Sequence, residues 1–313
     1  MSRALGIDVG GTKIAAGLVD EDGTISNETI APTPKGSSAE VLEVIAGLWE
    51  RFSQMSEIEA VGISAAGLVN KEMTEVTFAP HLPWVDEPLV ESVGAITNRP
   101  VVIDNDANAA AWAEHRFGSA KGFSDFIMVA VGTGIGGGIF VSGKPHRGAN
   151  GMAGEIGHLK VDPAGFDCAC GKKGCWEQYA SGNALGRLAR EYATQGEADS
   201  LISAAGSVAA ITGLQVTELV RRNDQAALKI LTEFASWLGV GIASLVAVLD
   251  PELIIVGGGV GELGAVLLDT VRSAVRENLI AGDVRALPLI VGAQLGNHAA
   301  VIGAADMARQ SIR

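Results

Sequence analysis

The chain opens with three short apolar runs separated by turn residues. They read LGIDVG, KIAAGLVD and TISNETIAP, with Gly10-Gly11-Thr12 after the first and Asp22-Gly23 after the second. Glycine and aspartate at such junctions are typical of tight turns between strands. The pattern therefore predicts a strand meander with glycine-bearing turns.

A helical periodicity follows the meander. Apolar residues recur from Val41 to Phe52, which predicts a helix from about Ser38 to Phe52 with a serine cap. Beyond it we expect two buried strands, Val61–Gly67 and Arg99–Asp106, and an alanine-rich helix between Asp106 and Phe117.

The hairpin pattern restarts at Phe126–Gly143, where two apolar runs again flank a glycine turn. Aligning Gly10 with Gly132 brings the ends of the two hairpins into register, which suggests two related α/β halves. Only the first copy brings a carboxylate to its loop, since Asp8 is replaced by Ala130 in the second.

Helical patterns dominate after a loop-rich segment at Gly148–Gly174. Helices are expected at about Trp176–Tyr192 and Ala226–Leu249, and a strand at Leu253–Gly259 is followed by further helices. The second helix has an apolar stripe formed by Leu231, Phe234, Leu238, Ile242 and Leu245. Strands alternating with helices predict an α/β fold.

Composition narrows the possible partners. At 313 residues the chain is long enough for two domains, and its formal net charge of -13 repels nucleic acid and anionic membranes. The longest apolar stretch, Trp237–Leu249, is too short to cross a bilayer. Asp8 interrupts the N-terminus before the apolar core of a signal peptide forms. We therefore expect a cytoplasmic protein.

The three cysteines, Cys168, Cys170 and Cys175, lie together and follow His158. An odd number cannot all pair within one chain, and four soft or borderline ligands fit a closed tetrahedral zinc site in a reducing compartment. Such a site is structural: it would hold the loop at Gly148–Gly174 and would not activate water. Three free thiols and a core histidine are the alternative.

Three glycine-rich loops follow predicted strands. DVGGTK, which begins at Asp8, offers backbone N–H groups, the Thr12 hydroxyl and the Lys13 cation to a phosphate chain. Asp8 could hold Mg²⁺ directly or through water. The other loops are Gly132–Gly138 and Gly257–Gly259, and ligands gather at the carboxyl ends of strands in open α/β sheets. One nucleotide could contact all three loops across a cleft; ordinary hairpin turns are the alternative.

Carboxylates suited to sugar chemistry stand at two places. Phosphoryl transfer to an alcohol needs a carboxylate that accepts the hydroxyl proton, and Asp106 stands where a strand ends and a helix begins. In Asp104-Asn105-Asp106, a helix cap is the alternative role for one residue. Glu155 and Glu177 flank the cysteine loop and could bind vicinal sugar hydroxyls, unless they are simply exposed to solvent.

Together, the motifs DVGGTK, IDNDANAAA, GTGIGGGI, EIGH, CACGKKGCWEQYASG and IIVGGG resemble the ROK family of sugar kinases and repressors, and most closely its bacterial ATP-dependent glucokinases. The resemblance covers nearly the whole chain. It implies the actin-like (ribonuclease-H-like) ATPase fold, with two α/β domains around a cleft. Residues 1–106 would form a small N-terminal domain, 107–297 a large one with the zinc site, and a last helix at about 298–313 would pack back on the small domain.

The resemblance also implies a role for each motif. Asp106 would be the catalytic base on the sugar 6-hydroxyl. The hexose would be bound by Gly67, Asn105, Asp106, Glu155, His158 and Glu177. ATP and Mg²⁺ would be bound by Asp8, Gly10, Gly11, Thr12, Lys13, Gly132, Thr133, Gly134 and Gly136, with Gly257, Gly258 and Gly259 on the adenosine side. Structural Zn²⁺ would be bound by one ring nitrogen of His158 and by Cys168, Cys170 and Cys175.

The activity implied is transfer of the γ-phosphoryl group of ATP to the 6-hydroxyl of glucose by a homodimer or homotetramer. N-acetylmannosamine, N-acetylglucosamine, fructose and mannose are alternative substrates, and polyphosphate is an alternative donor. A non-catalytic sugar sensor is a rival from another class. Repressors of the family carry an N-terminal helix-turn-helix, for which a first strand beginning by Ala4 leaves no room, so the kinase branch is favoured.

Overall fold

The computed structural model describes residues 3–313, and the chain divides into two compact units. The first unit comprises Met1–Ser124, Gly138–Gly154 and Gln294–Arg313, and the second comprises Asp125–Gly137 and Glu155–Ala293. The chain therefore crosses between the units four times.

The first unit is built on a five-stranded sheet of order β3-β2-β1-β4-β8. Strands β1, β2 and β3 form the antiparallel meander that the sequence predicts, and β4 and β8 run parallel to β1. A small sheet of order β5-β6-β7, which the sequence did not indicate, follows β4. The elements of this unit are β1 (Ala4–Val9), β2 (Lys13–Val19), β3 (Ile25–Pro32), α1 (Ser38–Ser53), β4 (Ala60–Ala65), β5 (Leu68–Val69), β6 (Val76–Phe78), β7 (Val85–Glu87), α2 (Leu89–Thr97), β8 (Val101–Asn105), α3 (Asp106–Phe117), β11 (Lys144–Pro145), η3 (Gly296–His298) and α11 (Ala299–Ser311).

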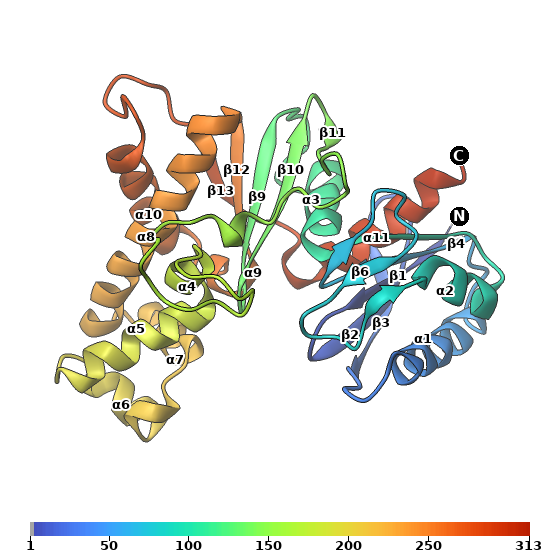
Figure 1. The fold of residues 1–313 in the computed structure, drawn as a ribbon, viewed down its shortest axis with the longest axis horizontal. Helices are drawn as coiled ribbons and strands as arrows, with labels where there is room; N and C mark the ends of the chain where they lie inside the picture. The colour runs from blue at the N-terminus through green and yellow to red at the C-terminus, as the bar shows by residue number, and fades with distance from the viewer. Residues whose placement is uncertain (1–2) are drawn as a thin grey trace. The chain divides into compact units, whose positions relative to one another are not determined.

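The helices expected in this unit form where the sequence places them. Ser37 caps α1, because its side chain accepts a hydrogen bond from the Glu40 N–H, and the apolar stripe of that helix is buried. The C-terminal helix α11, red in Figure 1, packs against α3, β1 and β4. A Cβ on Gly62 would lie 1.8 Å from the Ala304 carbonyl oxygen, so the helix lies directly on the strand backbone.

The second unit contains most of a sheet of order β11-β10-β9-β12-β13, in which β12 is parallel to both β9 and β13. Its strand order repeats that of the first sheet, in agreement with the repeat seen in the sequence. Strand β10 (Ile135–Val141) leads from this unit into the first. The other elements are β9 (Phe126–Val131), η1 (Ile156–His158), α4 (Glu177–Ala180), α5 (Gly182–Thr194), α6 (Asp199–Ala205), η2 (Val208–Ala210), α7 (Gly213–Arg221), α8 (Gln225–Leu249), β12 (Leu253–Gly257), α9 (Gly258–Gly261), α10 (Ala265–Asn278) and β13 (Leu289–Gly292).

Three sequence-based expectations need correction. The helix expected at Trp176–Tyr192 is two helices, because Ser181 interrupts it and caps α5 by accepting a hydrogen bond from the Ala184 N–H. The strand expected at Leu253–Gly259 ends at Gly257, where α9 begins. The segment after it is not all helical, since the four-residue edge strand β13 pairs with β12.

Helix α8 is the core of the second unit. Its predicted apolar stripe from Leu231 to Leu245 is buried throughout. Among residues 3–313 it is the one helix whose length and composition would allow a membrane span, and 61% of its most apolar window is buried inside the protein. Such burial is what a core helix shows.

Candidate functional site

Three parallel strands of the first unit bring polar side chains to one edge of the sheet. The register places Asp8 of β1 beside Ser64 of β4, and Ser64 beside Asp104 of β8. The Ser64 hydroxyl donates a hydrogen bond to Asp8 Oδ1 over 2.7 Å. The carboxyl ends of parallel strands are where α/β proteins bind ligands, so this edge is the first half of the candidate site.

Asp8 is a carboxylate with little compensating positive charge. Burial raises the pKa of Asp8, and the hydrogen bond from Ser64 and the charge of Lys13 offset that rise only in part. A divalent cation would supply the missing charge, and carboxylate oxygens are the ligands that Mg²⁺ prefers. The side chain therefore fits the role of a magnesium ligand, direct or through water.

The turn after β1 is held in place by hydrogen bonds to its backbone carbonyl groups. The Gly10 N–H donates to the Lys13 carbonyl over 3.0 Å, and the Thr33 hydroxyl donates to the Gly10 carbonyl over 2.7 Å. The Lys35 ammonium group contacts the Gly11 carbonyl and also donates to the His81 carbonyl. A turn fixed in this way can present backbone N–H groups to a phosphate at low entropic cost.

The residues at the end of β8 have different structural roles. Asn105 is the N-cap of α3: its Oδ1 accepts from the Ala107 N–H over 2.9 Å, and its Nδ2 donates to the Gly67 carbonyl over 3.2 Å. The capping role weighed for one residue of this segment thus belongs to Asn105. The same contacts bring Gly67 and Asn105, both expected in the hexose site, to the point where Asp106 begins α3.

Asp104 has a structural role. It is buried and accepts hydrogen bonds from Arg147 Nε over 2.7 Å and from Asn108 Nδ2 over 3.0 Å. Asp106 is only partly buried and stands at the positive end of the α3 dipole. Of the two aspartates, Asp106 is the more exposed.

In the second unit, four ligand atoms meet as the sequence predicts. The donor atoms of His158, Cys168, Cys170 and Cys175 lie within 4.8 Å of one another. Cys170 Sγ is 3.6 Å from Cys175 Sγ, and Cys168 Sγ is 3.8 Å from His158 Nδ1. A tetrahedral site with Zn–S bonds of about 2.3 Å separates its sulfur ligands by about 3.8 Å. The cluster therefore has the donors and the spacing of a closed zinc site.

The loop that carries these ligands is tied to the core. The Trp176 side chain is fully buried, and its Nε1 donates to the Trp237 carbonyl of α8 over 2.8 Å. Lys160 Nζ lies 3.0 Å from Cys175 Sγ and 2.6 Å from the Lys173 carbonyl. The Lys160 ammonium group thus places a positive charge beside one of the sulfur ligands.

Two carboxylates flank the histidine. Glu155 Oε2 lies 3.7 Å from His158 Nε2, and Glu177 Oε1 lies 4.0 Å from His158 Nδ1 and 3.1 Å from Cys168 Sγ. The histidine thus turns Nδ1 to the cysteines and Nε2 to Glu155. Burial raises the pKa of Glu155, the charge of His158 lowers it, and the charge of Glu177 raises it further. The expected cluster of Glu155, His158 and Glu177 is present.

The glycine turn after β9 lies next to this cluster. A Cβ on Gly134 would lie 2.7 Å from Glu177 Oε2, and the Gly132 carbonyl accepts the Gly182 N–H over 2.8 Å. The turn after β12 is adjacent, because Gly257 pairs with Ala130. There Gly258 has φ 77° and leaves no room for a Cβ against the Val131 carbonyl. Both glycine loops thus follow neighbouring parallel strands.

The expected site residues fall into two sets, one on each unit. Gly67, Asn105, Asp106 and the loop from Asp8 to Lys13 belong to the first, and Glu155, His158, Glu177, the cysteines and the other two glycine loops belong to the second. Ser64, Lys35 and Lys160 were not among the residues that the sequence pattern indicated. A serine in the apolar strand VGISAAG was a usable signal for Ser64; the two lysines gave none.

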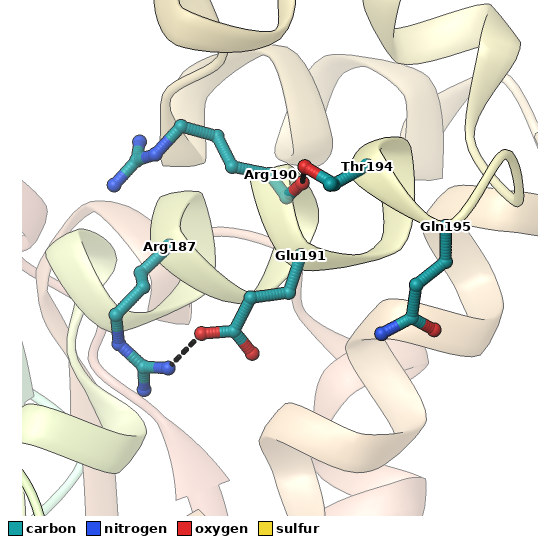
Figure 2. A pocket seen from close by; sticks show the side chains of 5 residues that line it. All are labelled: Arg187, Arg190, Glu191, Thr194 and Gln195. Atoms are coloured by element: carbon teal, nitrogen blue, oxygen red, sulfur yellow. Dashed lines mark hydrogen bonds and ion pairs between the residues drawn. The ribbon is translucent and has the colours of Figure 1, made fainter.

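A shallow hollow of about 350 Å³ lies elsewhere on the second unit, along α5 (Figure 2). Arg187 points to Glu191 across it, and these two form an ion pair of 2.5 Å. Arg190, the second cation that lines the hollow, donates a hydrogen bond to the Ile211 carbonyl. None of the expected site residues lines this hollow, so it is not part of the candidate site.

Comparison with known proteins gives full-length matches. A model of the ROK family matches residues 4–311. A glucokinase of Streptomyces coelicolor is 44% identical over an alignment of 313 residues, which covers 99% of this chain and 98% of that protein. The crystal structure of a ROK family glucokinase from Streptomyces griseus in complex with glucose and AMPPNP has a TM-score of 0.91 at 44% identity and covers 99% of this chain and 100% of that chain. A xylose repressor of Caldicellulosiruptor bescii is 32% identical and covers 97% of this chain but 77% of the repressor.

Proposed function

This chain belongs to the ROK family, and on that premise we propose that it is an ATP-dependent glucokinase, which transfers the γ-phosphoryl group of ATP to the 6-hydroxyl of glucose. The observation that carries the proposal is the full-length likeness to the Streptomyces griseus glucokinase bound to glucose and AMPPNP. The same likeness confirms the actin-like ATPase fold.

Asp106 is the proposed catalytic base. The 6-hydroxyl proton passes to its carboxylate as the oxygen attacks the γ-phosphorus, and the bond from that phosphorus to the bridging oxygen of ADP breaks. The position of Asp106 at the first residue of α3 supports this role, because a carboxylate interacts favourably with the positive end of the helix dipole. Asn105, which caps the same helix, holds that residue in place.

The phosphate chain is proposed to lie on the glycine loops. The fixed turn from Gly10 to Lys13 offers N–H groups, the Thr12 hydroxyl and the Lys13 ammonium group, and Gly132, Thr133, Gly134 and Gly136 offer a second set. Gly257, Gly258 and Gly259 are proposed for the adenosine side. Mg²⁺ held by Asp8 would neutralise charge on the β- and γ-phosphates.

The hexose is proposed to bind through Gly67 and Asn105 of the first unit and through Glu155, Glu177 and the Nε2 edge of His158 in the second. Paired carboxylate oxygens suit vicinal hydroxyls, since each can accept a hydrogen bond. Zn²⁺ on His158 and the three cysteines would supply rigidity to the loop that carries these side chains, and no chemical step.

The test is release of ADP by the purified protein over a panel of glucose, mannose, fructose, N-acetylglucosamine and N-acetylmannosamine. The proposal requires the highest kcat/KM with glucose and ATP. A higher kcat/KM with another hexose would make that hexose the substrate. Turnover with polyphosphate would make polyphosphate a phosphoryl donor. Hexose binding without ADP release would favour a sugar sensor, the reading to which the xylose repressor relatives point.

Two further features remain part of the proposal. The enzyme is proposed to act in the cytoplasm, where free thiols such as Cys168, Cys170 and Cys175 stay reduced. It is also proposed to form a homodimer or homotetramer, which analytical ultracentrifugation distinguishes.

A further inference from the structure

At two of the four crossings, 124/125 and 293/294, the residues on the two sides of the crossing peptide are hydrogen-bonded to their own units. At the last crossing, the Ala293 N–H donates to the Val256 carbonyl in the second unit over 3.0 Å. The next residue, Gln294, belongs to the first unit, and its N–H donates to Glu114 Oε1 over 2.9 Å. The adjacent residues Ala293 and Gln294 are thus each hydrogen-bonded within their own unit, and no residue lies between them.

The first crossing has the same character. The Ser124 carbonyl accepts the Gly143 N–H over 2.9 Å within the first unit. The carbonyl of the following residue, Asp125, accepts the Glu252 N–H over 2.8 Å within the second unit. Any rotation between the units must therefore change the dihedral angles at these two links, as it must at the other two crossings.

Glu114 binds the first-unit side of the last crossing directly and binds the turn at 118–120 that precedes the first crossing. It is fully buried, and its carboxylate accepts backbone N–H bonds from Ser119 over 2.7 Å, Gln294 over 2.9 Å and Leu295 over 2.8 Å. Its own carbonyl accepts the N–H groups of two further residues of the turn that leads to Ser124, namely Gly118 and Ala120. One residue thus receives five backbone donors from two distant segments.

The neighbouring sequence makes room for this carboxylate. A Cβ on Gly118 would lie 2.1 Å from Glu114 Oε2, so any larger residue there must displace it. Glu114 also lies on α3, about two turns after Asp106. The helix that begins with the proposed base therefore carries the anchor of both links.

We propose that Glu114 is a positioning residue that anchors the Ser124–Asp125 and Ala293–Gln294 links to the catalytic helix α3. When the second unit moves during turnover, it then pivots at these two links. Glu114 and α3 transmit this movement to Asp106. The catalytic part of this inference rests on the proposed kinase activity; the anchoring part does not.

Two variants test it. Glu114→Gln keeps the shape but replaces one acceptor oxygen by an NH₂ group, which cannot accept from a backbone N–H. Gly118→Ala leaves Glu114 in the chain but pushes its carboxylate away. Asp306→Asn is the matched control, because Asp306 is equally buried and joins α11 to Trp112 of α3 without touching either crossing. Gly94→Ala controls the glycine change, since a Cβ there meets open space.

We expect amide hydrogen exchange at Ser119, Gln294 and Leu295 to be at least tenfold faster in both test variants, and kcat per folded molecule to fall at least tenfold. Asp306→Asn should lower the Tm while leaving exchange at those amides and kcat within about twofold. The proposal is wrong if Glu114→Gln and Asp306→Asn change the Tm alone.

Exchange in the wild-type protein decides the anchoring part even if neither test variant folds. The three amides must then be protected to the level of the core strands, with or without glucose; exchange at loop rates overturns the anchor. Loss of protection in the two test variants, combined with no ADP release by the wild-type protein, would instead retain the anchor and reject the kinase assignment.

Discussion

Ser64 donates a hydrogen bond to Asp8 Oδ1 over 2.7 Å, across two adjacent parallel strands. That bond and the charge of Lys13 do not offset the desolvation of Asp8, because burial leaves the pKa of this carboxyl raised. An ionised group held in such a place lowers the stability of the free protein. Its retention is explained if it binds a cation that the substrate brings.

Asp8→Asn should therefore stabilise the free protein and abolish turnover. A folded-state pKa above the ordinary value of 3.8 means that this residue's contribution to stability is complete at pH below that value and is lost as the pH rises through the folded pKa. The variant lacks that loss, so its Tm should exceed the wild-type Tm by roughly 2 °C at pH 7 and by less at pH 4. Calorimetric scans of both proteins without nucleotide measure the difference.

Mg²⁺ and ATP provide the complementary measurement. They should raise the Tm of the wild-type protein and have little effect on the variant, because the ligand binds the folded state through Asp8. A variant that is less stable than the wild type at pH 7 would contradict the account of Asp8 as a carboxylate short of positive charge.

Asp106→Asn should reduce kcat by roughly 10²–10⁴-fold, the usual contribution of a general base. Glucose affinity, measured by calorimetry, should stay within about threefold, since the amide can still form a hydrogen bond to the hydroxyl. Asp104→Asn is the matched control: it weakens the pairing with Arg147 and should lower the Tm while kcat of the folded fraction is retained. Unchanged turnover in Asp106→Asn would remove this residue from the base role.

Local pattern was sufficient to predict most elements of the fold. The meander, α1, α3 and α8 carry strong periodicity and clear turn residues, so their existence follows from sequence spacing. Ser181 was missed because apolar residues keep helical spacing on both sides of it, and only its cap to Ala184 reveals the break. The strand β13 is four residues long and depends on pairing with β12.

The candidate site was predictable where its chemistry lies in contiguous motifs. The cysteines and His158 stand close together in sequence, and the residue types alone indicate zinc. The partners of Ser64 and Glu114 could not be found in this way, because they come from distant segments: Ser64 meets Asp8 through strand register, and Glu114 meets Gln294 across 180 residues of sequence. Such contacts follow from topology, which a single sequence does not display.

Cys170→Ser should remove zinc and weaken glucose binding together. Loss of one thiolate from a Cys₃His site leaves an incomplete tetrahedron, and the loop that places Glu155 and Glu177 loses its crosslink. We expect less than about 0.2 zinc per chain by elemental analysis and a glucose Kd raised by at least tenfold. Wild-type affinity in a metal-free Cys170→Ser protein would refute the structural role of the site.

Lys160→Met should release zinc to a chelator about tenfold faster than the wild type, the range typical of residues that support metal ligands. The physical reason is the contact of 3.0 Å between Lys160 Nζ and Cys175 Sγ, which offsets the net negative charge of three thiolates on one divalent ion. Lys173→Met is the control, because Lys173 lies in the same loop but pairs with Asp167. Equal release rates in the two variants would show that the effect is general surface charge.

Gly62→Ala should destabilise the first unit more than any surface change in it. The added Cβ would meet the Ala304 carbonyl at 1.8 Å, so α11 must move away from β4. Overpacking of this kind costs about 1–3 kcal/mol, or a Tm lower by roughly 5 °C. Gly94→Ala, in open space on α2, should raise the Tm slightly, since alanine is the better helix former. Equal Tm values for the two variants would mean that α11 does not lie on the strand backbone in solution.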